Sequence, residues 1–479
     1  MTTFVEAVQS QEARTENGMK ALKSSTSACV DLFFKIGASR GKDILKEFVA
    51  AYVENRELAL RIAQWARDVR GGSGERQLFK DILVHLEQRD PEAAKSLLMK
   101  VPNIGRWDDI FVFQTPEMKT SAYAMLGDAL RERDGLAAKW TPRQGPIAVE
   151  IRKFFGMSPK FYRKSLVEMT KVVEQQMCAK DWDEINFSHV PSVAHARYKK
   201  AFLRNTPKYK EYVAELTKDP KDRAVEVKIN AGAVYPYDVL KGVIPGGFLR
   251  NVDSIKDKTE LDVITAQWNA LENFMGDADV LPLIDVSGSM TVPVGGSSGI
   301  SCLQVAVSLG LYCADKNKGK FKDTFLTFSG NPELLHLKGD IIDKVQQIST
   351  STWGMNTDLA KAMNLILKTA LNGNVSQSEM PKMLLIFSDM QFDQCAEFDD
   401  TAMWLIEKKF TEAGYEMPAI VFWNLNAKDN VPVKANAKKV ALVSGFSPSI
   451  MKSVLSADSE KFTPEGIMLN TVMIPRYDI

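Results

Sequence analysis

A short segment in the second half of the chain combines residue types that can bind a metal ion. Asp285, Ser287 and Ser289 occupy alternate positions at the end of an apolar run. One carboxylate and two hydroxyls at this spacing can direct hard oxygen atoms to a common point, and Gly288 allows a close backbone turn. Such oxygens are the ligands that Mg²⁺ and Mn²⁺ prefer. The segment alone would also suit a strand-to-helix turn in which Asp and Ser act as caps.

Two polar residues further along the chain would complete a metal site. Asp389 follows a second apolar run, residues 383–387, and Thr357 lies just before a predicted helix. The carboxyl ends of parallel strands, and the loops that follow them, meet at one edge of a sheet. We therefore expect one Mg²⁺ or Mn²⁺ site formed by Asp285, Ser287, Ser289, Thr357 and Asp389.

Signals of catalysis are missing from the sequence. The chain has four histidines, and none has the spacing of a metal hydrolase. It has neither the Gly-x-Ser-x-Gly turn of a serine hydrolase nor a phosphate-binding loop that ends in Gly-Lys-Ser or Gly-Lys-Thr. We expect a binding protein and not an enzyme.

The elements that must position the metal site alternate between strands and helices. Apolar strands are predicted at residues 279–287, 323–329, 381–389 and 418–425, and helices at residues 301–316, 358–371, 401–414 and 447–455. Apolar runs of this kind are typical of strands buried on both faces. The pattern predicts a doubly wound parallel α/β domain.

The first half of the chain is predicted to be helical. Apolar residues recur at helical spacing from residue 41 to about 219, and capping residues before proline predict four helix starts, at Asp90-Pro91, Thr115-Pro116, Ser158-Pro159 and Thr206-Pro207. We expect a solenoid-like stack of short paired helices without a repeat of fixed length. Residues 220–275, rich in Gly and Pro before a helix-like stretch at 259–275, are interpreted as a connector. The predicted division is an arm at 1–40, a helical module at 41–258 and the α/β domain at 259–479.

Charge is distributed unevenly along the 479 residues. Residues 1–270 contain 43 Lys and Arg against 36 Asp and Glu, although the whole chain has 61 against 60. The window 139–210 alone contains 15 basic and 6 acidic residues. In it, aromatic residues (Phe161, Tyr162, Tyr198 and Tyr209) are interleaved with basic residues: Arg152, Lys153, Lys160, Arg163, Lys164, Arg197, Lys199, Lys200, Arg204 and Lys208.

Two interpretations of this basic window are open. Phosphate neutralisation combined with base stacking uses this mixture of side chains, so the window predicts nucleic-acid binding. The alternative is that Lys and Arg solvate helix faces while the aromatic residues fill the core, which is the better expectation for any single residue. For the window as a whole we favour nucleic acid.

Cysteine usage and hydropathy predict a cytoplasmic protein. The five cysteines lie far apart, so the sequence encodes neither a disulfide framework nor a zinc cluster. The N-terminal residues include acidic side chains and no apolar core, unlike a signal peptide. No apolar stretch approaches the roughly 20 residues of a membrane helix, and we expect no membrane partner.

The five candidate ligands resemble the metal-ion-dependent adhesion site of von Willebrand factor A domains. That family's pattern is Asp-x-Ser-x-Ser, then a threonine, then an aspartate after a central strand. The resemblance implies that Ser287, Ser289 and Thr357 bind the metal directly, whereas Asp285 and Asp389 act mostly through bound water. A cation with so little direct negative charge would seek a carboxylate or phosphate from a partner.

Five strings resemble the Ro autoantigen family or an uncharacterised family that joins a Ro-like module to an A domain. They are RDVRGGSGER (67–76), GRWDDIF (105–111), VPSVAHARYKKAFLRN (190–205), FWNLNA (422–427) and SGFSPSIMKSVL (444–455). The resemblance covers roughly residues 40–460. It implies a ring of HEAT-like helical repeats, closed by the A domain, that holds small structured RNAs and single-stranded RNA ends.

The string at 67–76 has a local interpretation of its own. Its glycines break the helix between arginines and acidic residues, which could form a turn that binds phosphate through backbone N–H groups. A helix corner interlocked by ion pairs is the alternative, and we favour it.

The sequence thus predicts a Ro-like protein that binds small non-coding or single-stranded RNA on its helical module and Mg²⁺ on its A domain. The alternative is an adaptor that captures a protein carboxylate through the metal and does not bind RNA.

Overall fold

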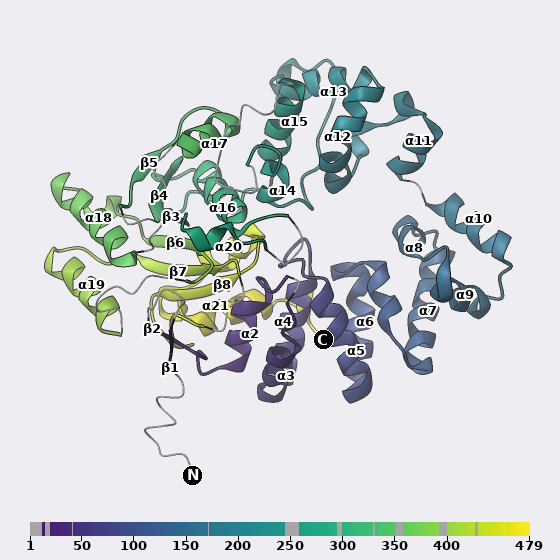
Figure 1. The fold of residues 1–479 in the computed structure, drawn as a ribbon, viewed down its shortest axis with the longest axis horizontal. Coiled ribbons are helices and arrows are strands. Elements are labelled where there is room, and N and C mark those ends of the chain that lie inside the picture. The colour runs from purple at the N-terminus through teal and green to yellow at the C-terminus, as the bar shows by residue number, and fades with distance from the viewer. Residues whose placement is uncertain are drawn as a thin grey trace, which may run out of the picture.

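A helical arc and a sheet domain share the chain, and both ends of the arc meet the sheet domain (Figure 1). The computed structural model describes residues 12–479 except 15–19, 41, 171, 245–257, 295–298, 329–330, 351–357, 392–399 and 427–429. The predicted order, a helical module followed by an α/β domain, is confirmed.

The sheet has six strands in the described part of the chain, in the order β5-β4-β3-β6-β7-β8. Only β5 runs antiparallel to its neighbour among these strands. The strands are β3 (Val280–Asp285), β4 (Thr324–Phe328), β5 (Leu334–His336), β6 (Met383–Ser388), β7 (Ala419–Asn424) and β8 (Val440–Ser444). The chain leaves β3 toward β4 on one side and returns to β6 on the other, so the strand order reverses between β3 and β6. Ligands of such sheets bind where the order reverses, at the carboxyl ends of the strands.

Helices cover the sheet closely. They are α16 (Cys302–Lys316), α17 (Ile341–Thr350), α18 (Leu359–Asn372), α19 (Asp400–Glu412), α20 (Met451–Leu455) and α21 (Pro464–Val472). A Cβ on Gly310 of α16 would lie 2.4 Å from Cδ1 of Ile284, so glycine lets α16 pack directly on β3. The sequence did not predict β5, β8 and α17, because β5 is short and exposed and β8 lies between turn residues.

The helical module begins after α2 (Ala28–Ile36), and its consecutive helices pack in pairs. They are α3 (Leu45–Glu54), α4 (Arg56–Arg67), α5 (Gln77–Arg89), α6 (Pro91–Ile104), α7 (Pro116–Arg131), α8 (Gly135–Trp140), α9 (Gly145–Phe154), α10 (Pro159–Met169), α11 (Val173–Ala179), α12 (Ser192–Asn205) and α13 (Lys208–Thr217). The connector forms α14 (Pro236–Leu240) and α15 (Lys258–Asn269). None of the helices in the described residues is long and apolar enough to cross a membrane.

Three of the four predicted helix starts are confirmed. The side chains of Asp90, Thr115 and Ser158 each accept a hydrogen bond from a backbone N–H in the first turn of α6, α7 and α10. The fourth helix, α13, begins one residue later than predicted, because Pro207 itself is the cap residue. Asn55 separates α3 from α4 and caps α4.

The described residues form two hydrophobic cores. The larger core is continuous from α2 through α10 and into the sheet domain. The smaller core is built around Phe187, Phe202, Tyr209 and Tyr212, and Val263 of α15 contributes to it. Helices α11–α13 are therefore a separate packing unit, attached to the sheet domain through α15.

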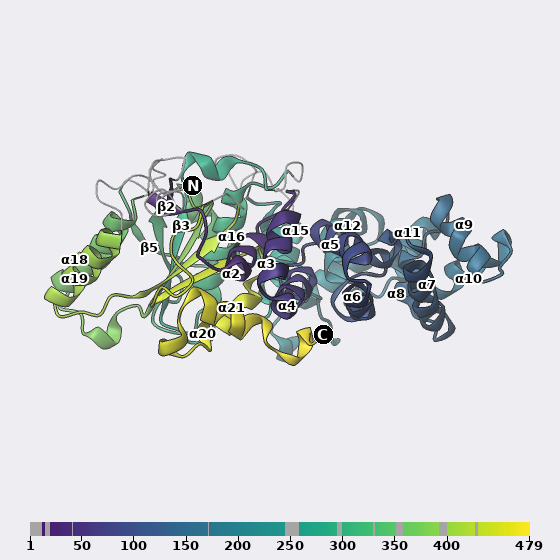
Figure 2. The same cartoon turned by 90° about the horizontal axis from the view of Figure 1, so that it is seen from below.

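Both ends of the chain join the helical module to the sheet domain. Near the N-terminus, α2 packs on β8. Directly after α2, the backbone N–H of Gly37 donates to Oγ of Ser444 at 3.0 Å. Near the C-terminus, Arg476 and Tyr477 donate to the buried carboxylate of Asp68. Figures 1 and 2 place the C-terminus beside α4, one of the first helices of the arc.

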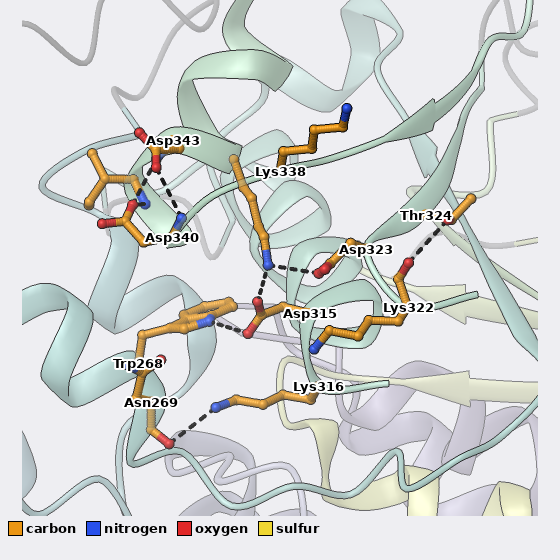
Figure 3. Close-up of polar contacts among 12 residues, drawn as sticks. Trp268, Asn269, Asp315, Lys316, Lys322, Asp323, Thr324, Lys338, Asp340 and Asp343 are labelled. Carbon is orange, nitrogen blue, oxygen red and sulfur yellow. Dashed lines mark hydrogen bonds and ion pairs between the residues drawn. The ribbon is translucent and has the colours of Figure 1, made fainter. Parts of the chain in front are cut away.

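A buried ionic network fixes α15 and α17 to α16 (Figure 3). Lys344 of α17, whose side chain is 6% exposed, donates to Asp315 and, at 2.7 Å, to Oδ1 of Asp323. Nε1 of Trp268 on α15 donates to Oδ2 of Asp315 at 2.8 Å. Both carboxylates therefore share one lysine as their cationic partner.

We predict that Lys344→Met lowers the free energy of unfolding by about 3 kcal/mol, because it leaves two largely buried carboxylates without their cation. Lys382→Met is the matched control, since Lys382 is 77% exposed and pairs with Asp279 at 3.1 Å. The control should cost less than about 1 kcal/mol. Urea unfolding of both variants measures the difference, and equal losses would contradict the structural role of Lys344.

Candidate metal centre

Four of the five predicted metal ligands meet at the carboxyl ends of β3 and β6. The Oγ atoms of Ser287 and Ser289 are 3.0 Å apart. The Ser289 hydroxyl donates to Oδ1 of Asp389 at 3.3 Å, across 100 residues of sequence. Asp285 lies at the end of β3, on the same edge. Thr357, the fifth predicted ligand, lies outside the described residues.

Asp285 is held rigidly although it lies at the start of a loop. Its side chain is completely buried. Oδ1 accepts a hydrogen bond from the Ser287 N–H at 2.9 Å, and Oδ2 accepts one from the hydroxyl of Ser388 at 2.6 Å. Ser388 was not predicted. Its only signal in the sequence is its place as the last residue of β6, directly before Asp389.

The electrostatics of this cluster suit a cation. Burial, followed by the neighbouring carboxylate of Asp389, raises the pKa of Asp285. A divalent cation between the two carboxylates would offset their repulsion, while Ser287 and Ser289 supply neutral oxygens. Among the described residues, no group of three or more His, Cys, Asp and Glu side chains could hold a metal. A site here therefore depends on the hydroxyls, and the donor set fits Mg²⁺ or Mn²⁺.

The loop that follows β7 supports the cluster from one side. The Leu425 N–H donates to the Ser388 carbonyl at 3.0 Å, and Nδ2 of Asn430 donates to the Met390 carbonyl at 3.0 Å. Nζ of Lys42, just before α3, donates to Asn426 at 2.5 Å. This loop thus links the metal cluster to the helical module. Gly288 has open space around its Cα, so the turn does not require glycine for steric reasons.

The ten basic residues predicted to bind RNA do not form one surface. Five of them lie on α9 and α10, where four are exposed: Lys153, Lys160, Arg163 and Lys164. The fifth, Arg152, donates to the Met157 carbonyl at 3.3 Å. We call α9 and α10 together the outer tip. Figures 1 and 2 show it at the end of the molecule opposite α18 and α19.

The remaining basic residues lie on α12 and at the start of α13, and several already have partners. Lys199 and Lys200 each lie 3.6 Å from Glu260 of α15. Burial lowers the pKa of Lys199, and Glu260 opposes that effect. Nζ of Lys208 donates to the Asp183 carbonyl at 2.8 Å. Arg197 and Arg204 are exposed on α12.

Most of the aromatic residues in the basic window belong to the core. Tyr162 is buried and donates to the Pro142 carbonyl, and Tyr209 is buried against Nε2 of His195 at 2.7 Å. Burial lowers the pKa of His195 to about 4. Among the four predicted stacking residues, only Phe161 is exposed, at 58%.

The glycine-rich string at 67–76 forms an ion-paired helix corner, the interpretation that we favoured. Nε of Arg67 lies 2.7 Å from Oδ2 of Asp109, and both side chains are buried. A Cβ on Gly72 would lie 1.7 Å from the Trp65 carbonyl oxygen, so any other residue would clash with the backbone. Two of the strings that carry the family resemblance are therefore joined here by a buried ion pair.

Two family models match different parts of the chain. Residues 279–471 match the family model described as Domain of unknown function (DUF7788), and residues 15–105 and 148–279 match Domain of unknown function (DUF2828). Neither description mentions a Ro-type module or an A domain, so those resemblances stay predictions.

An uncharacterized protein of Acanthamoeba polyphaga mimivirus is 29% identical over 522 residues, which cover 96% of this chain and 86% of the relative. Among solved structures, the crystal structure of the Deinococcus radiodurans RO (RSR) protein aligns with a TM-score of 0.39 and 14% identity, over 94% of this chain and 100% of that one. The fold described above rests on the chain itself and does not depend on that likeness.

We predict that Asp285→Asn abolishes Mn²⁺ binding measured by calorimetry. Asparagine keeps the shape and the hydrogen-bond acceptor for Ser287 but removes the charge. Asp279→Asn, at the opposite end of β3, is the matched control and should bind Mn²⁺ as the wild type does. Unchanged Mn²⁺ affinity in Asp285→Asn would refute the site, and tighter binding of Zn²⁺ than of Mn²⁺ by the wild type would count against hard oxygen ligands.

Proposed function

We propose that this protein binds RNA through the outer tip of its helical module and a divalent cation through the edge of its sheet. The observation that carries the RNA proposal is the uncompensated positive charge of the outer tip beside exposed aromatic rings. The resemblance of the sequence strings to the Ro family supports the same function.

The acidic residues of the outer tip are already paired with other helices. Glu150 accepts from Lys119 at 2.9 Å, and Glu168 accepts from Arg133 at 2.8 Å. In the described part of the chain, no carboxylate forms an ion pair with any of the four exposed cations (Lys153, Lys160, Arg163 and Lys164). The outer tip is therefore a cationic surface that lacks its own counter-charges, as phosphate binding requires.

Aromatic rings on the same helices are available for base stacking. Phe154 and Phe161 are 45% and 58% exposed, unlike the aromatic residues of α12 and α13. One edge of Phe154 packs near Tyr123 and Phe155, which leaves part of the ring open. Stacking of a base on such a ring contributes about 1–3 kcal/mol and tolerates any base. The outer tip thus favours single-stranded RNA and does not select a sequence.

A second function, metal-dependent capture of a protein partner, is supported by the cluster at the sheet edge. Ser287 and Ser289 would be neutral direct ligands, and the resemblance to the adhesion site implies that Asp285 and Asp389 act mostly through bound water, so a cation held there would keep much of its positive charge. Such a cation would bind a carboxylate or a phosphate of a partner. In an adaptor of this kind the helical module would be a scaffold. The two functions use different surfaces, and different variants separate them.

RNA binding by the outer tip should weaken steeply with salt. The logarithm of affinity against the logarithm of salt concentration should slope by about 0.7 for each neutralised phosphate of a single strand. Replacing Lys160, Arg163 and Lys164 with Glu should lower this slope by about 2 and weaken binding to all sequences alike, because backbone contacts carry no sequence information. Filter binding of homopolymeric and mixed RNA across salt concentrations measures both effects.

The matched control reverses three exposed lysines of the sheet domain, Lys318, Lys368 and Lys382, and so changes the net charge equally. It should keep the wild-type slope, as should Asp285→Asn. If the wild type binds no RNA at low salt, the RNA proposal fails. A protein ligand lost in Asp285→Asn would then support the adaptor.

A further inference from the structure

Two adjoining cavities lie on the inner side of the helical arc, between its first helices and α11–α12. The larger has a volume of about 750 Å³ and the smaller about 650 Å³. Both are lined by Arg76, Val193 and Arg197, which belong to segments far apart in the sequence. Each volume lies within the range of small-molecule sites, roughly 300–1,000 Å³. We call the two together the inner cavity.

We propose that the inner cavity binds a nucleoside phosphate, with Arg76 and Arg197 holding the phosphate group. This site is separate from the outer tip, so the inference goes beyond the proposed function. Three observations support it: the charge balance of the walls, the environment of Arg76, and the aromatic and amide side chains beside the two arginines.

The charges that line the larger cavity are only partly balanced. Among the described residues, four cationic and two anionic side chains line it. Arg106 forms an ion pair with Asp108, and Nζ of Lys139 lies 4.0 Å from Oε1 of Glu174. Glu184, the second carboxylate, is exposed to solvent.

The smaller cavity repeats this pattern. Nε of Arg40 lies 3.2 Å from Oε1 of Glu75, and Nζ of Lys241 lies 3.9 Å from Oδ1 of Asp238. Both of its carboxylates are therefore engaged with cations of the same wall. Within the ranges that the structure describes, Arg76 and Arg197 are the two lining cations without an ion pair, and they are the two charged residues that the cavities share.

Arg76 lies in a cluster of arginines. Arg76 is exposed to solvent, and its partial burial, followed by the positive charges of Arg106, Arg67 and Arg40, lowers its pKa. It also immediately precedes α5, a helix of 13 residues whose N-terminus has no side-chain cap. Backbone N–H groups of a first turn and an arginine beside them are both suited to phosphate oxygens. An anion at this point would reduce the repulsion among the arginines.

The wall of the larger cavity contains groups that suit a nucleoside. Trp140 and Tyr198 line it, together with the amides of Gln175 and Asn186. The guanidinium of Arg106 lies 3.9 Å from the centre of the Trp140 ring and covers one face of that ring. The Gln175 amide donates to the Val167 carbonyl and Oδ1 of Asn186 accepts from the Ser188 N–H, which leaves Oε1 of Gln175 and Nδ2 of Asn186 for the edge of a base. Tyr198 offers a ring on which a base can stack.

The nucleoside phosphate has two sources, a free nucleotide or one nucleotide of an RNA strand. Equilibrium dialysis of the full chain at low salt, with AMP, UMP, inorganic phosphate and a five-nucleotide RNA as probes, distinguishes them. The test variant is Arg76→Gln with Arg197→Gln, in which neither side chain has a structural ion pair to lose. The matched control, Lys318→Gln with Lys368→Gln, removes two charges from exposed positions of the sheet domain.

We expect the test variant to bind its nucleotide at least tenfold more weakly than the wild type, and the control to bind it normally. Binding of AMP or UMP alone identifies a free nucleotide, whereas binding of only the five-nucleotide RNA identifies an RNA strand. The proposal is overturned if none of the nucleotide probes binds, if the test variant binds as tightly as the wild type, or if phosphate binds as tightly as AMP.

Two further measurements keep this test independent of folding and of the outer tip. Thermal unfolding should show the same midpoint for the wild type and the test variant, and the single variant Arg197→Gln, at an exposed helix position, replaces it if it does not. Failure of the outer-tip proposal would appear as an unchanged salt slope of RNA binding in the Lys160, Arg163 and Lys164 variant, whereas nucleotide binding in the inner cavity would be unaffected.

Discussion

The buried carboxylate of Asp68 holds the two parts of this protein together. It accepts hydrogen bonds from Arg476 and Tyr477, so the last residues of the chain are fixed to the first helices of the arc. Both ends of the arc contact the sheet domain. Beside α2, the backbone N–H of Gly37 makes a second contact between the two parts by donating to Ser444 after β8. A single buried carboxylate with two donors is costly to break, because its charge would be left without compensation.

Charge compensation separates the joints of the protein from its candidate binding surfaces. At the helix corner, Arg67 is matched by Asp109, and both are buried, so this arginine is part of the scaffold. At the outer tip, the acidic residues pair with Lys119 and Arg133, and the exposed cations form no ion pair with any carboxylate of the described residues. Arg76 belongs to the same helix corner as Arg67, but it lines the inner cavity and has no ion pair among the described residues. Two of the strings that resemble the Ro family, 67–76 and 105–111, meet at this corner, and the corner accounts for their glycines and for the charges of Arg67 and Asp109.

The candidate metal centre follows from the topology of the sheet. The strand order reverses between β3 and β6, and the polar residues after both strands therefore meet at one point. The site is built into the core: Asp285 is buried, and Ser388 and the Ser287 backbone fix its two oxygens. Through Asn426 and Lys42 the neighbouring loop contacts the helical module. The sheet edge is thus structurally connected to the arc.

The sequence by itself determined the order of the elements and the chemistry of the sheet edge. Apolar runs predicted four of the strands, capping residues before proline predicted helix starts, and the rule for parallel strands brought Asp285 and Asp389 together. These predictions succeed because they depend on periodicity and on local hydrogen bonds. Only the tertiary structure decided which cations are available to a ligand. Lys199 and Lys160 look alike in the sequence, but Glu260, about 60 residues away, pairs with the first and no carboxylate in the described residues pairs with the second. The free energy of a charge depends on the charges that lie near it in space. A count of charges along the chain does not show which charges are neighbours.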